Sequence, residues 1–232
     1  MKYEDYKDKP LPDHTELRYD ECLAKLVLEE FFPNEFASLK ICDKPDLQDK
    51  EKNIGVEVTK AVNPIQKKNE SLYAKICYGV IHNKENEIKK INASYKPHSI
   101  IINSELMEEG DRYGERSLLG IPEENNFDRI TKSFEIKLNK INGQEYEIFK
   151  SNYFFIFSDV LADEIMIDDA IKSMNQLQSG KKIKINKVYV YVPHYIYVLN
   201  LEHERKEIIE VRRYQDSLAN KAREMVILRE IG

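Results

Sequence analysis

The clearest alternation of apolar and polar positions lies in residues 54–59, which read IGVEVT. Period-2 alternation is typical of a strand, so Glu57 is expected on the face opposite the two valines. A shorter apolar run, residues 39–42, precedes this strand, and the polar segment 49–53 lies between the two runs. A polar segment between apolar runs favours a turn, so the pattern predicts two strands joined by a turn.

Helical periodicity marks the segments around these strands, and short β-branched or aromatic runs mark further strands. The predicted helices cover residues 16–32, 65–91, 126–142, 163–178 and 214–228. The predicted strands beyond residues 54–60 cover residues 99–103, 152–157, 189–192 and 195–201. This interleaving of helices and strands predicts an α/β protein with a mixed central sheet flanked by helices.

A chain of 232 residues is long enough for one large domain with a full core. The polar residues 1–14 predict an N-terminal arm, and residues 15–232 predict a single α/β domain. Residues 104–125 are rich in Glu and Gly, which is typical of a surface loop or insertion. This loop separates a core, residues 15–103, from a C-terminal α/β part, residues 126–232.

Glu57 lies on a strand otherwise built for burial, where a carboxylate is costly unless something pairs with it. Asp46 lies in the segment that leads to this strand, so its carboxylate is the expected neighbour. Two like charges close together need a cation between them. Oxygen ligands from one or two carboxylates, completed by water and phosphate, suit Mg²⁺, and Mn²⁺ is the alternative ion.

A Pro-Asp pair ending at Asp46, then a loop, then Glu57-Val58-Thr59 on a strand resemble the motif of the PD-(D/E)XK nuclease superfamily. The resemblance covers residues 15–103 and implies a restriction-endonuclease-like αβββαβ core, followed here by a C-terminal α/β extension. It implies a metal-dependent DNA endonuclease that hydrolyses phosphodiester bonds, of a restriction or phage-defence type. Asp46 and Glu57 would bind the metal ion, with the carbonyl of Val58 as a third ligand.

The family has a lysine two residues after the strand carboxylate, and Thr59 stands there in this chain. The resemblance gives that lysine the role of orienting or deprotonating the attacking water. We include Thr59 and Lys60 among the catalytic candidates, because a threonine hydroxyl can hold a water or a phosphate oxygen. Strand alternation directs Lys60 to the opposite face, so a lysine from the predicted helix at 65–91 is expected to replace the missing one in space. The candidates are Lys67, Lys68 and Lys75.

In this family the first helix often lends an acidic residue to the metal site. The accessory candidates are Glu16 and Asp20 from the first predicted helix and Gln66 and Glu70 from the second. The first two lie on or beside the apolar face of residues 16–32, whereas Glu21 falls opposite, where solvent is the simpler explanation. For each accessory residue, a solvated position or the edge of a buried stripe is the alternative.

Lysines and arginines around the cleft would contact the DNA backbone. Lys60, Lys67 and Lys68 lie next to the motif in sequence, and we expect Lys67 and Lys68 to bind nucleic acid. A second, distant group is more simply a solvated face, and it comprises Lys181, Lys182, Lys184 and Lys187. Three further lysines are expected on the outer side of the predicted helix at 126–142, namely Lys132, Lys137 and Lys140.

The net charge of −5 argues against a protein wrapped broadly in nucleic acid but allows a local basic cleft. The three cysteines are far apart and the five histidines show no HExxH spacing, which argues against a zinc site. Isolated cysteines in apolar settings are typical of buried thiols in a reducing compartment. The start, MKYEDYKDKP, is not an apolar signal segment, and no run approaches the length of a membrane span. We therefore expect a cytoplasmic protein without membrane contact.

Three functions remain open at this point. The first is a metal-dependent DNA endonuclease, and the second is a catalytically inactive nuclease-fold module that binds DNA or protein. The third is an unrelated α/β interaction protein with a chance motif. A lysine ammonium near Glu57 would favour the first over the second, and convergence of Asp46 and Glu57 on one pocket would exclude the third. DNA is the expected partner, and a homodimer is left open.

Overall fold

The computed structural model describes residues 11, 14–62, 86, 89, 127–143 and 145–231. The chain divides into two compact units, Met1–Pro12 with Val62–Glu123 and Asp13–Ala61 with Glu124–Gly232. Every helix and strand given below belongs to the second unit, so the expected single domain over residues 15–232 stays a prediction. The predicted strand at 99–103 and the predicted loop at 104–125 lie outside the described residues, as does the predicted helix at 65–91 apart from Asn86 and Lys89.

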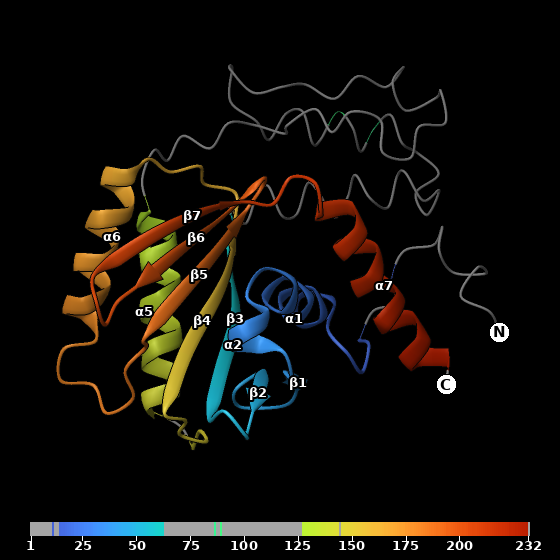
Figure 1. Ribbon diagram of the computed structural model, residues 1–232, viewed down its shortest axis with the longest axis horizontal. Coiled ribbons are helices and arrows are strands. Elements are labelled where there is room, and N and C mark those ends of the chain that lie inside the picture. Colours follow the sequence, from blue (N-terminus) through green and yellow to red (C-terminus); the bar gives the residue numbers. More distant parts are fainter. Residues whose placement is uncertain are drawn as a thin grey trace. The chain divides into compact units, whose positions relative to one another are not determined.

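The second unit alternates helices and strands along the chain (Figure 1). Its helices are α1 (Tyr19–Phe31), α2 (Pro33–Phe36), α5 (Asp128–Gly143), α6 (Glu164–Leu177) and α7 (Gln215–Ile231). Its strands are β1 (Lys40–Ile41), β2 (Leu47–Asp49), β3 (Ile54–Ala61), β4 (Ser151–Ser158), β5 (Lys187–Val192), β6 (Tyr195–Asn200) and β7 (Arg205–Glu210). The predicted α/β class with a mixed sheet is thereby confirmed.

The seven strands form one sheet in chain order, from β1 to β7. The central strands β3, β4 and β5 are parallel, and the outer strands pair antiparallel. Parallel neighbours need a crossover connection, and α6 lies in the crossover from β4 to β5. The buried runs of β4 and β5 are apolar on both faces, as expected for parallel strands covered by helices.

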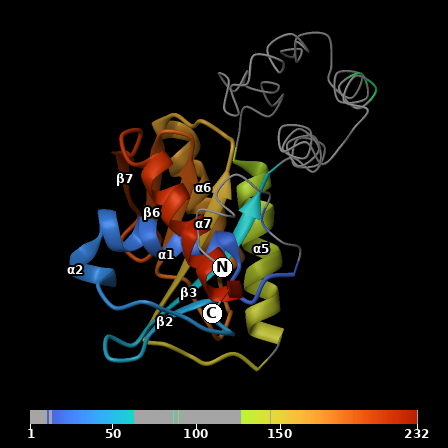
Figure 2. The same cartoon turned by 90° about the vertical axis from the view of Figure 1, so that its right-hand side faces the viewer.

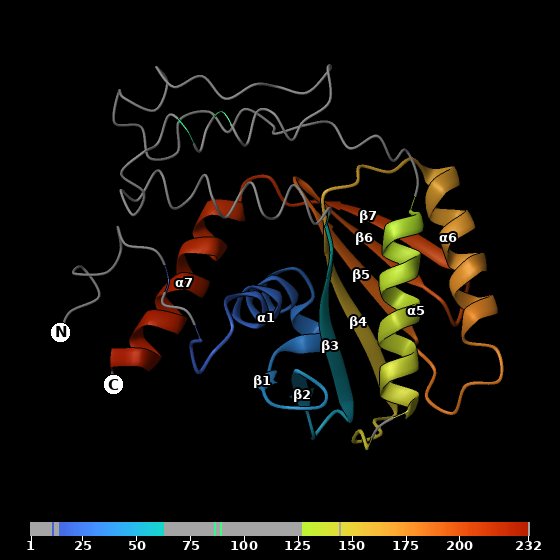
Figure 3. The ribbon, with the colours of Figure 1, turned by 180° about the vertical axis from the view of Figure 1, so that it is seen from behind.

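Helices cover both faces of the sheet (Figures 2 and 3). On one face, α5 and α6 bury their apolar stripes against β4, β5 and β6 in one continuous core that includes Phe134, Phe154 and Val190. On the other face, α1 lies near β3 and packs against α7, and α2 lies against β4 and β5 through Phe36. Strand β3 therefore lies between α1 and α5, and its two faces look toward different helices.

The region around the motif differs from the prediction in one respect. The apolar run before the motif was expected to pair directly with the strand at 54–60. Instead β1 pairs with β2, and β2 pairs with β3, with Leu47 opposite Val56. The sequence did not predict β2, because three residues are too few to show an alternating pattern. Two of the three, Gln48 and Asp49, are also polar although they are buried. This short strand ends the pairing of β3 after Val56 on that side.

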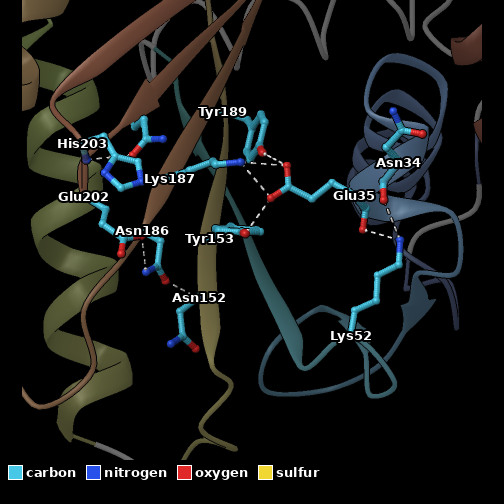
Figure 4. Close-up of polar contacts among 11 residues, drawn as sticks. Asn34, Glu35, Lys52, Asn152, Tyr153, Asn186, Lys187, Tyr189, Glu202 and His203 are labelled. Atoms are coloured by element: carbon cyan, nitrogen blue, oxygen red, sulfur yellow. Dashed lines mark hydrogen bonds and ion pairs between the residues drawn. The ribbon is translucent and has the colours of Figure 1, made fainter.

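Helix α2 is attached to the sheet by a polar cluster around Glu35 (Figure 4). The Lys187 ammonium lies 2.8 and 2.9 Å from the two carboxylate oxygens, and the hydroxyls of Tyr153 and Tyr189 donate to them at 2.6 and 3.0 Å. Lys52 closes the other side by donating to the carbonyls of Asn34 and Glu35. The cluster joins α2 to β4 and β5, and both carboxylate oxygens of Glu35 accept hydrogen bonds within it.

Replacing Glu35 by Gln should destabilise the protein at neutral pH. Burial alone raises the pKa of Glu35, but the hydrogen bonds from Lys187 and Tyr153 outweigh it, so this pKa lies below its ordinary value. A lowered pKa means that the ionised form stabilises the fold above the unfolded-state pKa, and this contribution disappears as the pH falls through the folded-state pKa. We expect a loss of about 1–3 kcal/mol at pH 7, shrinking in acid, by urea denaturation. The exposed Glu51→Gln is the control, and equal behaviour of the two variants would contradict this account.

Candidate metal and phosphate site

The Pro-Asp pair is held against β3 by local packing. The Cys42 backbone amide donates to the Asp46 carbonyl at 2.8 Å, and the side-chain Nε2 of the buried Gln48 donates to the Pro45 carbonyl at 3.1 Å. Pro45 also lies on Gly55, where an added Cβ would stand 2.7 Å from the proline ring and 2.7 Å from the Phe149 ring. Only a glycine at position 55 admits this approach, so Gly55 on β3 helps to fix the position of the Pro-Asp pair.

Asp46 lies beside the part of β3 that β2 does not cover. Its Oδ2 accepts a hydrogen bond from the Val58 amide at 2.7 Å. The carboxylate thus occupies the place that a neighbouring strand would take. Burial and then the charge of Glu57 raise the pKa of Asp46. The two predicted metal ligands therefore lie close enough for their charges to repel.

Glu57 is buried on the α5 side of β3, with 3% of its surface exposed. Its Oε1 lies 2.6 Å from the Lys137 ammonium and accepts a hydrogen bond from the Tyr146 hydroxyl at 3.0 Å. Its Oε2 is buried and has no hydrogen-bond partner among the described residues. Two donors therefore converge on one oxygen of Glu57, and the other oxygen is left over.

Lys137 was expected on the outer side of its helix, and that prediction was wrong. Its side chain is only 16% exposed and forms the ion pair with Glu57. Lys132 and Lys140 are exposed as expected. Lys137 also lies near enough to Asp46 to lower the pKa of that carboxyl. An ammonium from α5 thus stands beside the carboxylate of Glu57 on β3.

Glu21 was expected to face solvent, and this prediction was also wrong. Its side chain is 13% exposed and lies 3.8 Å from Arg18. Burial raises the pKa of Glu21 from 4.5 to about 7, and the charges of Asp46 and Glu57 add to the shift. The first helix therefore does contribute an acidic residue near the two motif carboxylates, but it is Glu21.

The other described candidates are placed as follows. Asp20 forms an ion pair with Lys60 at 2.6 Å, and both side chains are about one-third exposed. Glu16 is exposed and pairs with Arg229 of α7, 2.5 Å away. Thr59 is half-buried on the same strand face as Glu57. Asp20 and Lys60 thus neutralise each other, and the contact of Glu16 is with the C-terminal helix.

Five of the candidate residues lie outside the described residues, namely Gln66, Glu70, Lys67, Lys68 and Lys75. Of the distant lysine group, Lys187 belongs to the Glu35 cluster and Lys181 donates to Asn139 at 2.8 Å. Lys182 and Lys184 are exposed.

Within the part of the chain that the structure describes, no group of three or more His, Cys, Asp or Glu side chains is arranged to hold a metal ion by itself. In the same part, no helix has the length and apolar character to cross a membrane. Comparisons with protein-family models, with curated proteins and with solved structures found no match.

Glu21→Gln should stabilise the protein at alkaline pH. A raised pKa means that the neutral carboxyl stabilises the fold below pH 4.5, and that this contribution is lost as the pH rises through about 7. Glutamine keeps the neutral form at every pH. At pH 8 we expect the variant to exceed wild type by on the order of 1 kcal/mol, and the difference to vanish near pH 4.5. Urea denaturation across this range measures it, with the exposed Glu30→Gln of the same helix as control. A pH-independent difference would show that Glu21 is not in this electrostatic cluster.

Proposed function

We propose that the protein is a Mg²⁺-dependent nuclease that hydrolyses phosphodiester bonds in DNA. The observation that carries the proposal is the placement of Asp46, Glu57 and Lys137 around the part of β3 that β2 does not cover. These are two carboxylates and an ammonium, the groups that the motif of the resembling family requires. The lysine comes from α5 and not from the strand.

The residues at this edge fit a hard divalent cation. Oε2 of Glu57 is a buried carboxylate oxygen without a protein partner among the described residues, which is costly unless a cation binds there. Asp46 offers a second carboxylate. The Val58 carbonyl points to the same edge as its amide, because both groups of one strand residue face the same neighbour. Water and phosphate oxygens would complete the shell, as Mg²⁺ usually requires.

A bound Mg²⁺ would lower the pKa of a coordinated water and neutralise charge on the phosphate. Tyr146 and Lys137 hold Glu57 by Oε1, so Oε2 is the oxygen that would bind the ion. The Lys137 ammonium has three donors, so it can hold Glu57 and also donate to a phosphate oxygen or a water. Arg18 lies beside Glu21 with its side chain 78% exposed, so its guanidinium is suited to binding a phosphate of the DNA backbone.

The ion pair of Glu57 with Lys137 also favours a second candidate function. An ammonium 2.6 Å from the carboxylate offsets part of its charge without any bound cation. A nuclease-fold module that binds DNA or protein, without cleaving it, would need only this pair. The two functions differ in whether the residues turn over a substrate, and an assay of cleavage separates them.

Lys137→Met should abolish cleavage of DNA. In an assay of nicking and linearisation of plasmid with Mg²⁺ or Mn²⁺, we expect Asp46→Ala, Glu57→Ala and Lys137→Met each to lower the rate on the order of 100-fold or more. Lys132→Met removes an exposed lysine from the same helix and should leave the rate unchanged. Circular dichroism checks that each variant is folded, and Lys137→Arg keeps the cation if methionine disrupts the core.

Loss of DNA cleavage in the three site variants, with full activity in Lys132→Met, supports the nuclease. Equal cleavage by all variants identifies a contaminating enzyme and contradicts the proposal. Absence of cleavage by the wild-type protein on every DNA substrate rejects the nuclease in favour of the binding module.

A further inference from the structure

Strand β7 is the last strand of the sheet among the described residues, and its outer edge faces away from β6 (Figure 1). Its sequence, RKEIIE, is basic at one end and acidic at the other. Strand edges carry unpaired amides and carbonyls that can pair with another strand. We propose that this edge pairs antiparallel with β7 of a second copy, joining the two sheets in a symmetric homodimer.

The backbone at this edge can be assigned from the ladder. The Val211 amide, directly after β7, donates to the His194 carbonyl at 2.8 Å. Bonded and non-bonded pairs alternate along an antiparallel ladder, so Glu210 belongs to a non-bonded pair, as do Ile208 and Lys206. The amides and carbonyls of these three residues therefore point away from β6, toward the outer edge of β7.

Charge favours one of the three registers that place an outward-pointing residue of β7 on the two-fold axis. In an antiparallel pair, outward-pointing residues of the two strands stand opposite one another. Centring the two-fold axis on Ile208 places that residue opposite its own copy and places Lys206 opposite Glu210 at both ends. Centring it on Lys206 or on Glu210 would place two like charges directly opposite, which is destabilising. The favoured register makes about six backbone hydrogen bonds and two cross-strand ion pairs.

The side chains along this edge suit the same register. Lys206, Ile208 and Glu210 share the face of the sheet that carries α6, because Lys206 lies 2.7 Å from Asp168 and 3.3 Å from Glu164. These contacts hold the stem of Lys206 along the strand. Ile208 is 42% exposed, and Ile165 at the start of α6 is 71% exposed. The second copy would cover apolar surface that this chain leaves in water.

Charge exchange tests the register directly. Sedimentation equilibrium of the wild-type protein should show reversible dimerisation. Glu210→Lys should weaken it about tenfold or more, since lysine then meets Lys206 of the second copy, and Lys206→Glu should do the same by opposing Glu210. An equimolar mixture of the two variants restores both ion pairs and should dimerise again. Lys172→Glu, which makes the same charge change on an exposed position of α6, should behave as wild type.

A second variant protects the test from local damage to α6. Ile208→Lys places two ammonium groups on the two-fold axis and should give a monomer, whereas Ile136→Lys, on an exposed position of α5, should not. A wild-type protein that is monomeric at all concentrations overturns the proposal. Dimers that persist in Glu210→Lys and Ile208→Lys overturn it as well, and a mixture that stays monomeric overturns the register.

Discussion

A carboxylate buried on the central strand is the constraint around which this site is built. Glu57 is almost fully enclosed, so its charge must be matched nearby. The protein matches one of its oxygens with the Lys137 ammonium and the Tyr146 hydroxyl. This requires α5 to lie close along the strand, and it leaves the second oxygen without a protein donor among the described residues.

The position of that second oxygen depends on how β3 is covered. The short strand β2 stops pairing at Val56, and Asp46 takes over at Val58 through its side chain. Gly55 makes this possible because it lets the proline before Asp46 approach the strand. Helix α1 then brings Glu21 to the same region, where burial and then repulsion from nearby carboxylates raise its pKa. The fold thus places the carboxyl groups of Glu21, Asp46 and Glu57 near one another, and a divalent cation would relieve the repulsion among them.

Much of this could be predicted from the sequence, because Asp46 and Glu57 belong to a continuous local pattern. The helical contributors were harder to identify. Glu21 lies three residues before Ala24 and seven before Leu28, both buried, so it borders the buried face of α1. The predicted apolar face was drawn from the larger side chains alone, and Glu21 does not lie on that face.

Lys137 likewise borders the buried stripe of α5 through Phe134 and Ile141, a position that a general expectation of exposed lysines conceals. Tyr146 lies in a loop without periodicity, so no sequence signal marked it. Strand β7 was missed because both of its faces carry charged residues.

The most direct test of the site is a crystal structure of the protein soaked in Mn²⁺, with anomalous difference density measured at the manganese edge. The account predicts one peak within coordination distance, about 2.0–2.3 Å, of an Asp46 oxygen and of Oε2 of Glu57, with Lys137 and Tyr146 still on Oε1. Absence of a peak at that position, at a Mn²⁺ concentration that saturates exposed carboxylates elsewhere, would contradict the claim that this edge of β3 is a metal site.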